Sequence, residues 1–313
     1  MGAFCGRDQS VPFQNRSCGH AANPGAFALH TIQNSVDGPA SICHSASIPL
    51  EVPLATFTTL KAGRGLLHAR GNWSSRDDRT PSVIWLGVLW AGMIAGFGVD
   101  ISRFLHENPA APTVVRVHAF VFTAWMLILT AQVLLVVRDR VALHRRLGWF
   151  AAAWACVMAV LGPWAAIESL VVSAQSSSID PAFLSVNLVD IAGFLALLAW
   201  GIKLRGNPAA HRRMMILATV SLADPGFSRF SSWLWPTEPH STIVWFLDVF
   251  YGNVLMVVLM TAWDWWRGRM VRSFVIGASA LLAAEFAASC LYFWGPWKAA
   301  TGAFIETCAR LHI

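Results

Sequence analysis

Five of the hydrophobic segments of this chain each contain a residue that can ionise. A charge inside a membrane-spanning helix costs roughly 2.5 to 3.5 kcal/mol on insertion scales, so such residues usually face a protein interior and serve a function there. A histidine beside carboxylates can share a proton with them, and an arginine can balance their charge. The five residues are His118, Glu168, Asp190, Arg229 and Asp248.

Composition indicates which elements must position these residues. The chain has 313 residues, of which 56% are hydrophobic and 13% charged, and its mean hydropathy is +0.52. These values exclude a soluble domain of this size. The net charge of +6 does not indicate a nucleic-acid partner, because the basic residues cluster in short connections between hydrophobic runs.

Seven runs are long enough to cross the ~30 Å hydrocarbon layer, which takes about 20 apolar residues in a helix. Each run is continuously apolar and lacks the in-out alternation of a membrane barrel. We therefore expect an all-α integral membrane bundle with about seven transmembrane helices. The expected spans are residues 82–101, 114–137, 147–172, 183–202, 214–235, 243–266 and 273–295.

Basic residues in the connections predict the orientation. The connections after the second, fourth and sixth spans hold eleven Lys and Arg residues, whereas the three opposite connections hold only Arg103 and Arg116. The positive-inside rule then places the N-terminus in the cytoplasm and the C-terminus outside. We expect the partners to be the lipid bilayer and the anionic headgroups beside the cytoplasmic arginines.

Three regions of the chain differ in composition. Residues 1–80 are rich in Ser, Gly, Pro, Asn and His without helical or strand periodicity, so they are either a disordered cytoplasmic tail or not part of the native protein. Residues 81–297 form the seven-span domain, and residues 298–313 a short outer tail. The cysteines of the first region match no zinc spacing, and we expect no metal site.

The ionisable residues of the spans fall at similar depths. At 1.5 Å per residue, those of the second, fourth and sixth spans share a layer ~7 to 10 Å below the outer face, and those of the third and fifth approach it from the far ends. An asparagine one turn from Asp190 lies on the same helical face. The expected ligand or proton pocket consists of His118, Glu168, Asn187, Asp190, Arg229 and Asp248.

Two functions fit such a pocket. It could serve a proton-coupled or small-ligand-binding protein, since ionisable groups inside spans mark proton and substrate pathways. It could instead belong to a structural or assembly protein in which polar residues only specify helix packing. The pair Pro225 and Gly226 also predicts a break in the fifth span.

Two of the basic connections repeat a His-Arg-Arg motif. Residues 141–148 read VALHRRLG and residues 208–215 read PAAHRRMM. With HAFVFTAW at 118–125 and Asp190 in the fourth span, these motifs resemble an uncharacterised family of bacterial polytopic membrane proteins. The resemblance covers about residues 82–295 and implies a multi-pass protein of the bacterial inner (plasma) membrane, without implying an activity.

A looser likeness is to the b-type haem membrane proteins such as cytochrome b561. Those proteins use histidines on neighbouring helices as axial ligands of the iron. The likeness implies His144 and His211 as ligands, with Arg145 and Arg212 beside the haem propionates. The alternative function is then membrane electron transfer with haem b, and catalytic residues and enzyme class stay unassigned.

Overall fold

The computed structural model describes residues 75–106, 111–176, 179–234 and 241–311. Every regular element in these ranges is a helix, which confirms the all-α fold class. The region expected to be a tail, residues 1–80, lies almost wholly outside the described residues.

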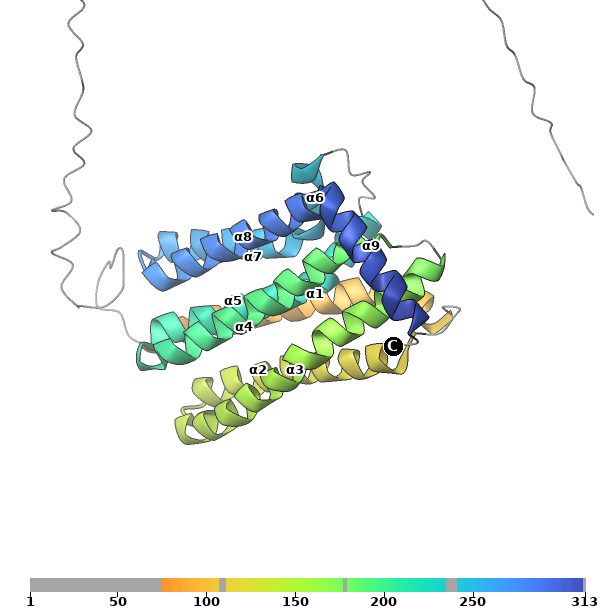
Figure 1. Cartoon of the computed structure of the whole chain (residues 1–313). Coiled ribbons are helices and arrows are strands. Elements are labelled where there is room, and N and C mark those ends of the chain that lie inside the picture. The colour runs from red at the N-terminus through yellow and green to blue at the C-terminus, as the bar shows by residue number, and fades with distance from the viewer. Residues whose placement is uncertain (1–74, 107–110, 177–178, 235–240, 312–313) are drawn as a thin grey trace, which may run out of the picture. The chain divides into compact units, whose positions relative to one another are not determined.

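The helices follow one another with short connections. Three 3-10 helices are η2 (Ser75–Asp78), η3 (Pro181–Phe183) and η4 (Leu204–Gly206). The α-helices are α1 (Arg79–His106), α2 (Thr113–Val137), α3 (Val141–Ser176), α4 (Leu184–Lys203), α5 (Pro208–Leu234), α6 (Thr242–Val249), α7 (Tyr251–Trp266), α8 (Arg272–Phe293) and α9 (Gly295–Arg310). Figure 1 shows the long helices side by side, with α9 crossing one end of the bundle obliquely.

The number of candidate spans in the described residues is smaller than expected. The helices long and apolar enough to cross a membrane are α1, α2, α3, α4 and α8, and α6 with α7 makes a sixth if the bent pair is one span. These helices fit a multi-pass membrane protein. The expected fifth span, residues 214–235, lies mostly in α5, which does not belong to this apolar set.

The position of α5 explains its lower hydropathy. This helix packs against α1, α4, α7 and α8, and it buries Arg213, Thr219, Ser221 and Asp224. Because other helices surround it, α5 meets little of the lipid and can carry polar residues toward the protein interior. The polar side chains that lower the hydropathy of α5 are therefore among those buried inside the bundle.

The expected sixth span, residues 243–266, is bent rather than straight. α6 and α7 differ in direction by 74°, and Phe250 between them has φ −98° and ψ 23°, away from α-helical values. At the start of α7, Gly252 lies so close to the Phe227 ring that a Cβ there would overlap it. The bend brings the α7 backbone directly onto this side chain of α5.

Pro225 does not break α5, which continues to Leu234. Instead of a break, this part of α5 makes a close contact with α1. A Cβ at Gly96 would overlap the Gly226 carbonyl oxygen, and a Cβ at Gly92 would overlap the Phe227 ring. Glycines four residues apart are a common means of bringing two membrane helices together. Gly226 therefore lets α1 pack tightly against α5.

Replacing Gly96 with Ala is expected to lower the free energy of unfolding by about 1 to 3 kcal/mol, because the new methyl group meets rigid backbone. Thermal unfolding of the detergent-purified protein measures this loss. Gly98→Ala is the matched control, since a Cβ at position 98 has open space around it. Equal melting temperatures for the two variants would contradict the close α1–α5 contact.

The basic connections lie at one end of the bundle, as a shared cytoplasmic face requires. Salt bridges join them to the start of the described chain: Arg79 with Asp139, Arg212 with Asp78, and Arg269 with Asp77. The hydrogen bond from Arg79 lowers the pKa of the exposed Asp139 carboxyl. The arginine-rich loops are thus gathered on one side of the expected membrane.

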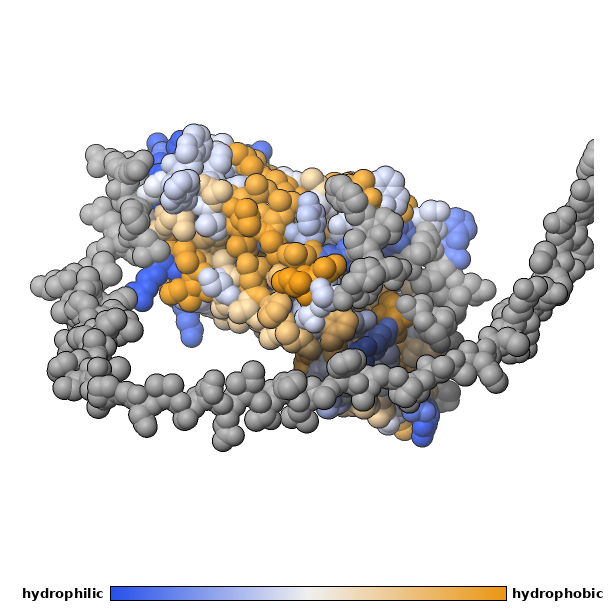
Figure 2. Space-filling view, turned by 90° about the horizontal axis from the view of Figure 1, so that it is seen from above, coloured by the Kyte–Doolittle hydropathy of each residue, from blue (hydrophilic) through white to orange (hydrophobic). Residues whose placement is uncertain are grey.

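The outer surface of the bundle is largely apolar. Figure 2 shows hydrophobic residues over the middle of one face and hydrophilic residues toward the two ends. Large apolar side chains such as Phe120, Leu127, Val160 and Ile94 are more than half exposed. A surface of this kind is stable against lipid chains and costly in water.

Candidate functional site

Three carboxyl groups and one amide are buried in the interior of the bundle. Asp190 of α4, Asp224 of α5, Asn253 of α7 and Glu285 of α8 have exposed fractions of 8%, 2%, 0% and 0%. We call these four residues the carboxyl cluster. Buried polar groups on four neighbouring helices are the strongest candidate for a functional site in the described chain.

Hydrogen bonds connect parts of the carboxyl cluster. The Asn253 amide donates to Glu285 Oε1 at 2.6 Å, which joins α7 to α8. Ser221 of α5 donates to the backbone carbonyl of Asp190 at 2.7 Å, which joins α5 to α4. These bonds hold the four helices together in two pairs at the level of the cluster.

A glycine on α4 permits this close approach. A Cβ at Gly193 would lie 3.0 Å from both Leu281 of α8 and Ser221 of α5. Gly193 is three residues after Asp190, so it lies on nearly the same face of α4. The sequence thus places the acidic side chain where its helix comes nearest to two others.

Several oxygen atoms of the cluster have no hydrogen-bond partner among the described residues. They are Asp190 Oδ1, Asp224 Oδ1, Asn253 Oδ1 and Glu285 Oε2. An unsatisfied buried acceptor costs about 1 to 3 kcal/mol, and an ionised one costs more. These atoms are therefore sites where a proton or another ligand would be stabilising.

The acidic groups also interact with one another. Asp224 lies within electrostatic range of Asp190, Glu285 and Arg229, and Asp190 within range of Glu285. Arg229 itself pairs with Asp100 of α1, with Nε 3.1 Å from Oδ2, and donates to the Pro225 carbonyl at 2.7 Å. Arg229, which interacts electrostatically with Asp224, is thus already paired with another carboxylate.

Transition-metal binding is not indicated by this geometry. Across residues 75–311, with the gaps in the description excepted, no group of three His, Cys, Asp or Glu residues is arranged to hold a metal ion. All the cluster's unsatisfied atoms are oxygens, which can accept hydrogen bonds and can also coordinate cations.

The residues of the pocket predicted from sequence lie in different places. Asp190 belongs to the carboxyl cluster, and Arg229 is within electrostatic range of it. The contacts of three others are local to their own helix or to the turn before it. The His118 ring stacks on Phe122, Glu168 accepts a hydrogen bond from Trp164, and Asn187 donates a hydrogen bond to the Phe183 carbonyl. Asp248 is partly buried in α6, just before the bend.

Three cluster residues, Asp224, Asn253 and Glu285, do not belong to the pocket predicted from sequence. Glu285 stands in the middle of a continuously apolar run, LLAAEFAAS, and this position alone was a sufficient signal. Asn253 gave a weaker signal, because an amide is not charged and is tolerated within spans. Depths estimated by counting residues along each span place the expected pocket near the outer face, whereas the carboxyl cluster lies in the interior of the bundle.

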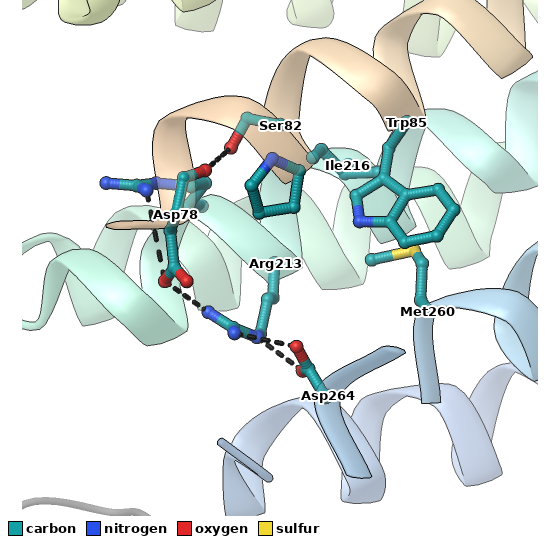
Figure 3. Close-up of a pocket in the computed structure, with 9 residues that line it drawn as sticks. Asp78, Ser82, Trp85, Arg213, Ile216, Met260 and Asp264 are labelled. Carbon is teal, nitrogen blue, oxygen red and sulfur yellow. Dashed lines mark hydrogen bonds and ion pairs between the residues drawn. The ribbon is translucent and has the colours of Figure 1, made fainter. Parts of the chain in front are cut away.

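A second polar site lies at the end that carries the basic loops. Arg213 of α5 binds Asp264 of α7 through two hydrogen bonds, Nε to Oδ2 at 2.6 Å and Nη2 to Oδ1 at 2.8 Å. Its Nη1 donates to Asp78 Oδ2 at 2.8 Å. Figure 3 shows the Arg213 side chain between the two carboxylates. The three side chains are all less than 10% exposed.

Further arginines surround this site and complete its charge balance. Arg269 contacts Asp78 Oδ1 at 3.6 Å and Asp77 at 3.3 Å, and Arg212 contacts Asp78 at 3.8 Å. Beneath the site is a cavity of about 10 Å³, lined in part by Ser82, Trp85 and Met260. That volume admits about one water molecule. We call Asp77, Asp78, Arg212, Arg213, Asp264 and Arg269 the arginine network.

The two histidines of the repeated motif come together at the same end. The His144 ring of α3 and the His211 ring of α5 are 6.3 Å apart between centroids and nearly perpendicular. His211 Nδ1 is 2.8 Å from the Gly201 carbonyl. Of the two motif arginines expected beside a haem, Arg212 instead belongs to the arginine network, and Arg145 lies one residue after His144 on the exposed start of α3.

Comparison with known proteins adds no assignment to this geometry. No family model, no curated protein and no solved structure matches the chain.

Proposed function

We propose that this protein is a proton-coupled carrier of a bacterial inner membrane, and that the carboxyl cluster is its proton-binding site. The observation that carries the proposal is the set of four unsatisfied oxygens on α4, α5, α7 and α8, buried together inside the bundle. Buried acceptors without a protein partner are satisfied by a proton, a water molecule or another ligand, and ionisable groups inside spans are commonly functional.

The charge of the cluster favours protons as the ligand. Asp190, Asp224 and Glu285 are within electrostatic range of one another, and three ionised carboxylates at low dielectric constant repel strongly. Sharing protons removes this repulsion and supplies hydrogen-bond donors to the empty acceptors. Binding and release of such protons is the step that a coupled carrier needs.

The bent pair of helices supports transport rather than a passive packing role. Membrane carriers commonly build their binding sites beside interrupted helices, where one half can move relative to the other. The 74° bend at Phe250 lies three residues before Asn253, and thus next to the cluster. We further propose that the basic loops face the cytoplasm and contact anionic headgroups there.

Proton counting on the purified protein tests this proposal. Titration in detergent from acidic to alkaline pH should release more protons from the wild type than from a variant carrying Asp190→Asn, Asp224→Asn and Glu285→Gln. Repeating the titration with added NaCl tests whether Na⁺ competes with protons for the cluster. If it does, Na⁺ should release protons from the wild type and not from the triple variant. Identical proton release by the two proteins would overturn the proposal.

Haem binding is the second candidate, and the His144–His211 pair favours it. Two imidazoles from different helices face one another at 6.3 Å, and His211 holds a backbone carbonyl through Nδ1, as axial histidines do. Insertion of a porphyrin would require α3 and α5 to separate, since the rings are already in edge-to-face contact range. A Soret band that shifts on reduction and is lost in His211→Ala would favour haem, and a featureless spectrum would exclude it.

A further inference from the structure

The arginine network joins three elements that lie far apart in the sequence. Asp78 belongs to η2, Arg213 to the beginning of α5 and Asp264 to the end of α7. Arg213 contacts both carboxylates, and its exposed fraction is 6%. A bidentate arginine pair has a fixed geometry, so a small displacement of either helix breaks it.

α7 connects this network to the carboxyl cluster. Asn253 lies near its start and donates to Glu285, while Asp264 lies near its end and binds Arg213. Eleven residues separate the two positions, which is about 16 Å along a helix. α7 also begins at the 74° bend, and the ends of elements at such breaks are common hinge positions in proteins.

We propose that the arginine network is the gate at this end of the carrier, closed in the present structure and opened when α7 swings about Phe250. This inference rests on the proposed function, because it names the gate of the same transport site. Ser82 and Met260 line the same cavity of about 10 Å³ as Asp78, Arg213 and Asp264, so separation of the network would expose them.

The charges around the gate explain why closure is stable and still reversible. Three arginines, Arg212, Arg213 and Arg269, face three aspartates, Asp77, Asp78 and Asp264. The network is therefore neutral as a whole, and several of its partners can exchange as α7 moves. An apolar seal of the same size would lack these alternative pairings.

Thiol labelling measures the opening directly. Ser82→Cys, in a chain whose native cysteines are replaced by Ser, places a reporter under the network at a position that is 6% exposed. Reaction of the new cysteine with a charged maleimide should be slow while the arginine network is intact. Adding Asp264→Asn should speed it about tenfold or more, because the closed state loses the charged pair with Arg213.

Two controls separate gate opening from general loosening. Asp139→Asn breaks the exposed pair with Arg79 at the same end and should leave the labelling rate unchanged. Ser185→Cys is an equally buried reporter on α4, 4% exposed and bonded to α8, and Asp264→Asn should not expose it. Arg213→Lys keeps the positive charge but cannot bind a carboxylate through two nitrogen atoms at once. It should therefore give an intermediate labelling rate at Ser82→Cys.

The outcomes distinguish the gate from the proposed function. Unchanged labelling of Ser82→Cys in both Asp264→Asn and Arg213→Lys would overturn the gate, whatever the proton titration shows. Equal acceleration at Ser82→Cys and Ser185→Cys would also overturn it, since that indicates loss of structure. Faster labelling at Ser82→Cys alone supports the gate, even if the carboxyl cluster releases no protons.

Discussion

Glu285→Gln is expected to abolish proton-coupled activity while leaving the fold intact. The glutamine side chain has the same shape, and its oxygen can still accept the hydrogen bond that Asn253 donates to Glu285 Oε1. Only the titratable proton is lost. We expect fewer protons to be released on titration, and a change in the free energy of unfolding of no more than about 1 kcal/mol.

Glu306→Gln is the matched control for this variant. Glu306 is exposed on α9 and pairs with Arg310 one turn away, so the same chemical change should alter neither titration of the cluster nor stability measurably. If Glu285→Gln instead lowers the melting temperature strongly and leaves proton release unchanged, the buried carboxyls have a packing role. The structural or assembly function would then be favoured.

Arg213→Ala is expected to cause the largest loss of stability. Removal of this guanidinium leaves Asp78 and Asp264 buried without their shared partner, and breaking a buried ion pair typically costs about 3 to 5 kcal/mol. Thermal unfolding in detergent measures the loss. Arg79→Ala, which removes the partner of the exposed Asp139, should cost far less stability than Arg213→Ala.

A double variant tests whether the pair with Asp264 causes this loss. Arg213→Ala combined with Asp264→Ala removes both charges, so its cost should be smaller than the sum of the two single costs. Additive costs would contradict a direct energetic coupling between the two side chains. The bidentate geometry at 2.6 and 2.8 Å makes additivity an unexpected result.

Much of the fold could be predicted from sequence because lipid imposes strong constraints. Continuous apolar runs predict helices wherever they occur, and eleven basic residues in alternate connections predict that these connections share one end. The bend at Phe250 could not be predicted, because it accompanies a contact between Gly252 and Phe227 of another helix. Tertiary contacts of this kind leave no local pattern.

The candidate site was predicted only in part, for a related reason. Depth along a span can be estimated by counting residues, but the face that a residue presents depends on helix packing. Asp190 was singled out and lies in the carboxyl cluster, whereas Glu168 accepts from Trp164 on its own helix. Glu285 could have been found from its apolar surroundings, since the deepest charge in a span is the most costly one.

Infrared spectroscopy of the purified protein measures whether the carboxyl cluster holds protons inside the membrane domain. At neutral pH the exposed carboxyls are ionised, so a carbonyl stretching band of protonated carboxylic acid would come from buried groups. We predict this band in the wild type and its loss in the variant with Asp190→Asn, Asp224→Asn and Glu285→Gln. Absence of the band from the wild type, or its persistence in that variant, would contradict the account.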